Sequence, residues 1–109
     1  MTTACDLTHK RCVPCVGGVP ALDADATAAL LPQVPAWTAR DAKLHRTFQF
    51  ADFVAAMRFV NAMADVAEAE GHHPDFLVHY NTVDVSIWTH AVGGLTENDF
   101  ILAAKIDAL

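Results

Sequence analysis

The strongest constraint on the fold is one long amphipathic segment, from about Ala51 to Glu70, that must become a helix. Its apolar side chains recur at steps of three and four residues, the period of an α-helix that buries one face. The members of this stripe are Phe53, Met57, Val60, Ala64 and Ala67, flanked by Val54, Ala56 and Met63. Gly71 stands where a left-handed residue is favoured, and Pro74 disfavours helical dihedral angles at His73, so the helix must end just before His72.

Alternating side chains precede this helix. From Lys43 to Phe50 apolar and polar residues alternate, which predicts a strand with one face in water. Arg46 interrupts the apolar side, and we place it at a rim. A turn near Asp41-Ala42 would pair this strand with the segment Trp37–Arg40.

A second predicted hairpin follows the helix. It joins Asp75–Tyr80 to Val83–His90 through a tight turn at Asn81-Thr82. In the later strand two faces are distinct, an apolar one with Val83, Val85 and Ile87 and a second one with Asp84, Ser86, Trp88 and His90.

Two further helices complete the order of elements. Asp23 can cap a helix that runs to Leu31, where Pro32 stops it, and Thr96 is set to cap the N–H of Asp99 in a last helix. The order predicts an α+β fold of two strand-strand-helix units, with a four-stranded, mainly antiparallel sheet that carries helices on one face. We expect a single domain over residues 22–109, preceded by an irregular, cysteine-containing arm over residues 1–21.

Composition excludes several classes of protein. The 109 residues are 53% hydrophobic and 18% charged, which is not the composition of a disordered chain. A formal net charge of -6 argues against nucleic acid or an anionic membrane surface as the main partner. No apolar run approaches the roughly 18 residues of a membrane span, and the first residues lack a secretory signal pattern, so we expect a cytoplasmic protein.

The densest group of chemically active residues surrounds the end of the long helix. His72 and His73 are adjacent in extended backbone and point in opposite directions, and the second hairpin returns His90 to the same end of the sheet. Three imidazoles that titrate near neutrality make a proton-transfer site, with Glu68 one turn before them to orient or pair with a ring. A zinc ion held by the three rings is the rival interpretation. His9, His45 and His79 are read as ordinary surface or structural residues.

The N-terminal arm is a separate candidate. Cys5, His9, Cys12 and Cys15 offer thiol and imidazole ligands at a spacing that fits no standard zinc motif. An arm without chemistry, a metal site and a redox pair all remain open, whereas a disulfide framework does not suit a cytosolic chain with so apolar a core.

The aromatic residues divide into two groups. Most belong to the core by their helix and strand spacing, namely Phe48, Phe50, Phe53, Phe59 and Phe76. Trp88 lies instead on the polar face with His90, where it could pack against a flat ring ligand or form a subunit contact.

Taken together, these residues resemble the pterin-4a-carbinolamine dehydratase (4a-hydroxytetrahydrobiopterin dehydratase) family. The signature is Glu68-x3-His72-His73-Pro74-x5-Tyr80-x9-His90-x8-Asp99. Further similar blocks cover residues 22–109 in order, among them Leu30-Leu31-Pro32, Phe48-Gln49-Phe50-Ala51-Asp52-Phe53, Thr89-His90 and Gly94-Leu95-Thr96. Gly71 departs from the family, where many relatives carry a polar or acidic residue, and the cysteine arm lies outside the signature.

The resemblance implies a function as well as a fold. It implies dehydration of 4a-hydroxytetrahydropterin to quinonoid dihydropterin in tetrahydrobiopterin recycling, with no metal or organic cofactor, in a homodimer or homotetramer linked functionally to an aromatic amino acid hydroxylase. The catalytic histidines of the family map onto His72, His73 and His90. We expect His73 and His90 to divide the acid and base roles and His72 to orient the pterin. The expected substrate-binding residues are Glu68, Pro74, Trp88, Thr89 and Asp99, with the backbone near Thr89 on the amide edge of the ring.

An alternative from another class remains. Animal members of the family also act as dimerisation cofactors of a transcription factor, so a non-catalytic assembly role is the second hypothesis. Three convergent imidazoles favour the enzyme. The sequence leaves open the natural pterin side chain and the choice between dimer and tetramer.

Overall fold

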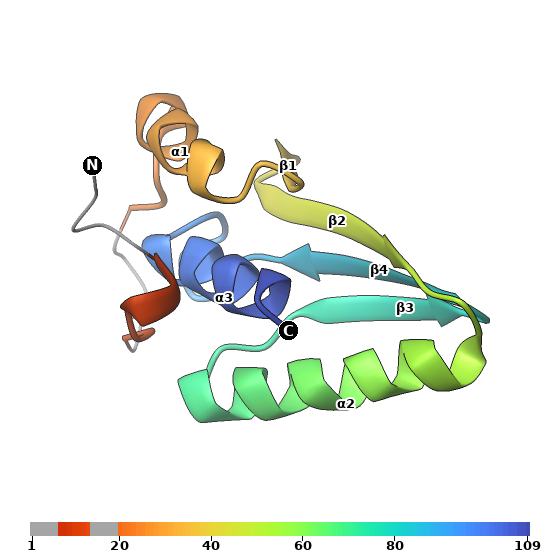
Figure 1. Cartoon of the computed structure of the whole chain (residues 1–109). Helices are drawn as coiled ribbons and strands as arrows, with labels where there is room; N and C mark the ends of the chain where they lie inside the picture. Colours follow the sequence, from red (N-terminus) through yellow and green to blue (C-terminus); the bar gives the residue numbers. More distant parts are fainter. Residues whose placement is uncertain (1–6, 14–19) are drawn as a thin grey trace.

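The structure is a computed structural model, and it describes residues 7–13 and 20–109. Four strands form one sheet in the order β1-β2-β4-β3, and every neighbouring pair is antiparallel. The predicted α+β class and the open antiparallel sheet are confirmed (Figure 1). The elements are η1 (Leu7–His9), α1 (Ala24–Leu30), η2 (Leu31–Gln33), β1 (Thr38–Arg40), β2 (Lys43–Gln49), α2 (Phe53–Glu70), β3 (Asp75–His79), β4 (Thr82–Ile87) and α3 (Glu97–Asp107).

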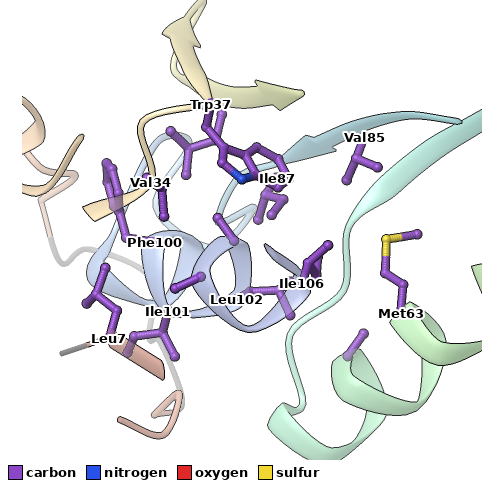
Figure 2. Packing of buried hydrophobic residues seen from close by; sticks show 14 of the residues in the cluster. Leu7, Val34, Trp37, Met63, Val85, Ile87, Phe100, Ile101, Leu102 and Ile106 are labelled. Atoms are coloured by element: carbon purple, nitrogen blue, oxygen red, sulfur yellow. The ribbon is translucent and has the colours of Figure 1, made fainter. Parts of the chain in front are cut away.

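Helices α2 and α3 cover the apolar face of the sheet. Val83, Val85 and Ile87 of β4 are at most 1% exposed, so the predicted division of that strand into two faces is confirmed. Helix α3 is buried on nearly all sides. The sheet covers one side of it, and the described part of the arm, including η1, covers another. Leu7 of η1 is 1% exposed and belongs to this core (Figure 2). Residues 7–9 are thus a short 3-10 helix packed on α3, where the sequence predicted irregular chain.

The stripe of α2 differs from the predicted one. Its buried members are Ala56, Val60, Met63 and Ala67, whereas Phe53 and Val54 in the first turn are about half exposed. The helical period allows two neighbouring apolar stripes on this helix. The stripe with Ala56, Val60, Met63 and Ala67 is the one that is buried. The predicted core role of Phe53 and of Phe76, which is 45% exposed on the edge strand β3, is therefore wrong. The other predicted core phenylalanines, Phe48, Phe50 and Phe59, do pack against the core.

The termini of the helices follow the sequence signals. Asp52 accepts a hydrogen bond from the N–H of Ala55 at 2.8 Å, which caps α2. Gly71 closes the same helix with a left-handed φ of 63°. Asp23 caps α1 in the same way, but Pro32 lies inside the 3-10 turn η2 and does not end the helical stretch cleanly.

The two hairpins turn on residues with positive φ. Asp41 and Ala42 join β1 to β2 as predicted, with φ of 54° and 60°. In the second hairpin the pairing of His79 with Thr82 makes Tyr80-Asn81 the two-residue turn, one position before the predicted one. Strand β4 also ends at Ile87 and not at His90, because β2 and β3 offer no partner beyond that point.

Arg46 shows how a charge is accommodated on the apolar side of β2. Its guanidinium forms an ion pair of 2.5 Å with Asp107 at the end of α3 and lies over the ring of Phe48. Asp107 also accepts a hydrogen bond from the indole N–H of Trp37. The rim position predicted for Arg46 therefore lies beside the C-terminal end of α3, which supplies its carboxylate partner.

Candidate functional site

The histidine pair lies in the segment that connects α2 to β3. The left-handed Gly71 turns the chain out of the helix, and Pro74 holds the following backbone extended, so the two neighbouring rings point in opposite directions. The side chain of His72 turns inward and is 13% exposed, whereas that of His73 is 61% exposed. One pair of neighbouring residues thus contributes one buried and one accessible imidazole.

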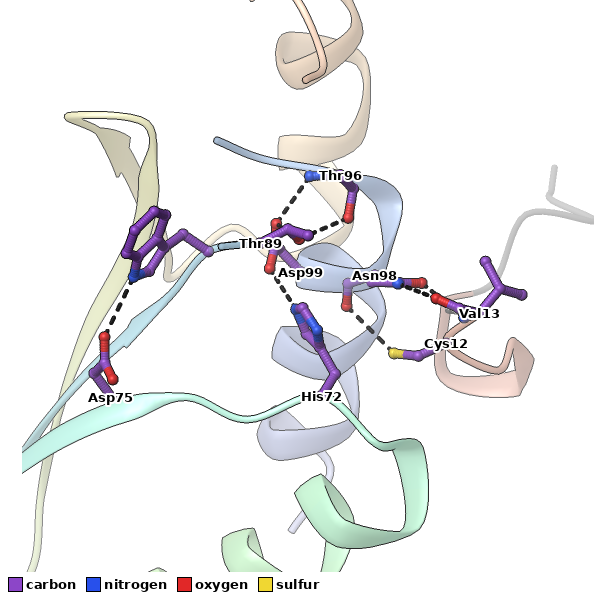
Figure 3. A network of polar contacts seen from close by, with 9 residues as sticks. Cys12, Val13, His72, Asp75, Thr89, Thr96, Asn98 and Asp99 are labelled. Carbon is purple, nitrogen blue, oxygen red and sulfur yellow. Dashed lines mark hydrogen bonds and ion pairs between the residues drawn. The ribbon is translucent and has the colours of Figure 1, made fainter. Parts of the chain in front are cut away.

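His72 is held by a buried carboxylate. Its Nε2 lies 2.6 Å from Oδ1 of Asp99, which is 0% exposed (Figure 3). The other carboxylate oxygen accepts hydrogen bonds from the Thr89 hydroxyl at 2.9 Å and from the Thr96 N–H at 2.8 Å. Asp99 therefore ties α2, the end of β4 and α3 together at one point. Asp99 is fully buried and does not line the cleft described below, and its carboxylate holds the His72 ring.

His73 has a carboxylate partner of a different kind. Its Nε2 lies 2.6 Å from Oε2 of Glu68, one turn back on α2. The pairing of Glu68 with an imidazole matches the sequence expectation. Because the Glu68 side chain is 80% exposed, water competes with this contact and leaves the His73 ring free to turn.

His90 lies just beyond β4 on an aromatic support. Its ring stacks on Trp88 with centroids 4.0 Å apart and the planes tilted by 30°. The indole N–H of Trp88 donates to Asp75 of β3 at 3.3 Å, and the ammonium of Lys43 lies 5.0 Å from the Trp88 ring centroid. Trp88 thus joins β2, β3 and the loop that carries His90.

The three histidines line one cleft. Its volume is about 280 Å³, and its remaining walls are Gly71, Trp88, Thr89 and Ala91. This volume lies at the lower end for small-molecule sites, which suits one flat ring system. Two other expected binding residues do not line the cleft: Pro74 is half-buried next to His73, and Glu68 contacts the His73 ring.

The backbone of Thr89 is used by its own loop. Its N–H donates to the carbonyl of Gly94 at 2.9 Å, and its carbonyl accepts from the N–H groups of Val92 and Gly93. These bonds shape the turn that presents His90. The N–H and the carbonyl of Thr89 are therefore both occupied within the loop.

The described part of the arm crosses the ends of α2 and α3. The N–H of Cys12 donates to Oε1 of Glu70 at 2.8 Å, and Asn98 exchanges two hydrogen bonds with the backbone of Val13. Lys105 and Arg11 both pair with Oε2 of Glu70. Burial raises the pKa of Glu70, but hydrogen bonds from Lys105 and Cys12 and the charges of Lys105 and Arg11 outweigh it and hold that pKa below its usual range.

The thiol of Cys12 is poorly suited to metal or redox chemistry. Burial, followed by the charge of Glu70, raises the pKa of Cys12 to about 12, and its Sγ lies 3.5 Å from the carbonyl oxygen of Asn98. Cys5 and Cys15 lie outside the described residues, and His9 is exposed at the end of η1. Within residues 7–13 and 20–109, no group of three or more His, Cys, Asp or Glu side chains could hold a metal ion.

Sequence reasoning missed two parts of the site. Glu70 and Asn98 were not singled out, because nothing in the sequence places the arm against the ends of both helices. Asp75 was missed too, although the hairpin register, which sets it opposite Ser86 and near Trp88, is a signal that could have found it.

Solved structures share this fold. A crystal structure of a transcriptional coactivator/pterin dehydratase from Brucella melitensis has a TM-score of 0.77 at 34% identity and covers 81% of this chain and 96% of its own. A pterin dehydratase-like protein, identified as a RuBisCO assembly factor in the alpha-carboxysome, has a TM-score of 0.56 at 22% identity over 66% of this chain and 83% of its own. The α+β architecture with its histidine cleft is thus a pterin dehydratase fold.

Sequence comparison identifies the family. The model of the pterin 4 alpha carbinolamine dehydratase family matches residues 20–109, and the chain belongs to that family. A relative from Nitrosomonas europaea, provisionally named a pterin-4-alpha-carbinolamine dehydratase, is 50% identical over 100% of this chain and 97% of its own length. A relative from Dechloromonas aromatica with the same provisional name is 46% identical over the same shares. The resemblance seen in the sequence is therefore confirmed.

Proposed function

We propose that the chain dehydrates 4a-hydroxytetrahydropterin to quinonoid dihydropterin by acid-base catalysis from histidine, within tetrahydrobiopterin recycling. The observation that carries this proposal is the meeting of three imidazoles around one ring-sized cleft. The reaction breaks the C4a–O bond and removes the proton on N5, so the products are the quinonoid dihydropterin and water. Each step needs a proton delivered or accepted near neutral pH, which imidazole does well.

The hydrogen bonds support a division of roles among the rings. An ionised Asp99 places the proton of a neutral His72 on Nε2 and leaves Nδ1 as the acceptor. We therefore assign His72 to removal of the N5 proton, a change from the orienting role expected from the sequence. We place His73 and His90, the two exposed rings, beside the 4a oxygen of the substrate. A protonated ring there donates its proton to this oxygen, which then leaves as water.

The pterin ring is bound by the walls of the cleft. Trp88 supports His90 and offers an aromatic edge to a flat heterocycle. We place the amide and amino edge of the ring against the backbone near Thr89, where Trp88 and His90 line the cleft. No step in this scheme calls on a cofactor.

The direct test replaces each histidine by alanine. The carbinolamine is generated in situ by an aromatic amino acid hydroxylase, and its ultraviolet band is followed. We expect His72→Ala, His73→Ala or His90→Ala to lower turnover by about 10² or more while circular dichroism stays unchanged. The matched control is His79→Ala, because His79 pairs with Asp84 on the open face of the sheet, away from the cleft. Wild-type rates in all three variants would exclude the assignment.

A second candidate is a non-catalytic assembly role. It is favoured by apolar side chains left exposed on β3 and its turn, where Phe76, Leu77 and Tyr80 are 45%, 58% and 66% exposed. The relative described as a RuBisCO assembly factor shows that this fold can serve assembly. Failure of the wild-type chain to accelerate carbinolamine decay, together with a protein complex that survives His72→Ala, would support this candidate over the enzyme.

A further inference from the structure

Two consecutive residues of the arm join the end of α2 to the start of α3. The N–H of Cys12 donates to Oε1 of Glu70, the last residue of α2, at 2.8 Å. The next residue, Val13, donates its N–H to the Asn98 side chain at 3.0 Å, and its carbonyl accepts from the Asn98 amide at 2.6 Å. One short piece of backbone thus bridges the last turn of α2 and the first turn of α3.

The bridged residues are close neighbours of the His72–Asp99 contact. Glu70 precedes His72 by two positions, and Asn98 directly precedes Asp99. Figure 3 shows the two contacts next to each other on α3, with Asn98 against the arm and Asp99 against His72. A shift of either helix end would therefore move one partner of the 2.6 Å contact relative to the other.

The contacts of the bridge are shielded from water and reinforced by charge. Asn98 and the Glu70 side chain are each 5% exposed. Lys105 lies 2.7 Å from Oε2 of Glu70 and so ties the same carboxylate directly to α3. On the outer side, Arg11 pairs with Oε2 of Glu70 at 3.2 Å and donates to the Ala69 carbonyl at 3.2 Å. Because water competes little with buried hydrogen bonds, these contacts hold the two helix ends more firmly than exposed pairs would.

The chain needs such support because it leaves α2 through a glycine. Among the described residues, no atom lies within 4 Å of a Cβ built at Gly71, so packing does not hold this position. Glycine also has more backbone freedom than any other residue. In the proposed function, on which this inference rests, His72 accepts the N5 proton of the pterin. A small displacement of a catalytic group lowers the rate steeply.

We infer that the arm is part of the catalytic apparatus: by joining Glu70 to Asn98, it holds the His72 ring against Asp99 for proton transfer. Glu70 and Asn98 are thus positioning residues, which act through His72 and do not touch the substrate. The role uses the backbone of Cys12 and Val13 and needs no chemistry from the Cys12 thiol.

Two variants weaken the bridge from its two sides. Asn98→Ala removes the two hydrogen bonds with the Val13 backbone, and Val13→Pro removes only the N–H donor of an exposed arm residue. The matched control is Asp107→Ala, which removes the contacts with Arg46 and Trp37 at the opposite end of α3. This control should lower the stability to urea without changing the residues around the cleft.

Turnover tests the effect on catalysis. We expect both arm variants to lower kcat for the carbinolamine by about tenfold with little change in KM, because the ring is displaced while the cleft remains. The control Asp107→Ala should keep the wild-type kcat although it is less stable.

The His72 ring can also be observed without turnover. Its Nε2–H, held by a buried carboxylate, should give a proton NMR resonance downfield of the backbone amides, and this resonance should disappear in His72→Ala. We expect it to shift and broaden in Asn98→Ala and in Val13→Pro, and to stay in place in Asp107→Ala. A loss of stability alone would not move it in the folded protein.

The outcomes separate this inference from the proposed function. Wild-type kcat in both arm variants would overturn the inference, as would an equal loss of kcat in Asp107→Ala or a His72 resonance that stays in place while kcat falls. Absence of dehydration by the wild type would overturn the proposed function, whereas the His72 resonance would still show whether the arm holds the ring.

Discussion

At the scale of single residues, burial separates two hydrogen bonds of the same length. The His72–Asp99 and His73–Glu68 contacts are both 2.6 Å, but Asp99 is 0% exposed and the Glu68 side chain is 80% exposed. Water competes with the second contact and cannot reach the carboxylate of the first. The buried contact therefore controls the tautomer of its ring, and the exposed one does not.

Exchange of each carboxylate for its amide tests this difference. We expect Asp99→Asn to lower kcat by roughly tenfold or more, because an amide can donate to Nε2 and so reverse the tautomer of His72. The matched Glu68→Gln change should alter kcat only a few-fold, as expected for an exposed pair. The turnover rates and pH profiles of the two variants, measured in parallel, test this prediction. Equal losses of kcat in both variants would contradict the role assigned to the Asp99 contact.

Cys12 gives a second prediction at this scale. With a pKa of about 12, its thiol carries almost no thiolate at pH 8. We expect iodoacetamide to modify Cys12 in the folded protein at least about tenfold more slowly than in urea-unfolded chain, as measured by peptide mass spectrometry. A rate as fast as in the unfolded chain would show that the arm does not dock at the ends of α2 and α3.

At the scale of elements, the arm is anchored by one buried carboxylate. The Glu70 side chain is 5% exposed and binds the Cys12 backbone and Lys105 at once. Neither partner is near Glu70 in sequence, so the anchor forms only when α2, α3 and the arm are assembled. Its strength depends on the charge of Glu70.

The stability of this anchor should depend on pH. Because the pKa of Glu70 is lower in the folded protein than in the unfolded chain, its contribution is complete above the unfolded value and is lost as pH falls through the folded value. At pH 7 we expect Glu70→Gln to lower the free energy of unfolding by about 1–2 kcal/mol, as measured by urea denaturation. The difference from wild type should shrink on acidification, and a difference independent of pH would contradict this account.

The sequence predicted most elements and the left-handed Gly71 at the end of α2, because these depend on neighbours along the chain. It misplaced the stripe of α2, since Phe53 and Ala64 satisfy the helical period as well as the residues that are buried. It also extended β4 to His90, because the length of a strand depends on where its partners end.

At the scale of the whole molecule, apolar surface remains on the edge of the sheet. Strand β3 pairs on one side with β4, and its other side faces outward in the described chain, with Leu77 58% exposed. An unprotected apolar edge strand is a template for pairing with another chain. We expect a second copy of this protein to cover this edge.

Charges placed on this edge should weaken such an assembly. We expect the wild type to migrate as a dimer or larger in size-exclusion chromatography with light scattering, and a Phe76→Lys, Leu77→Asp variant to shift toward the monomer mass of 11.7 kDa. Thr82→Lys, on an inner strand, is the control for added charge. A monomeric wild type would contradict the prediction.

The sequence by itself determined the class of fold, the approach of three histidines to one end of the sheet and the family. These follow from periodicity, capping residues and a motif, which are all local along the chain. Tertiary structure alone decided which histidine is backed by Asp99 and where the arm docks. The physical reason is that burial and contacts between distant residues arise only when the helices and the sheet pack together.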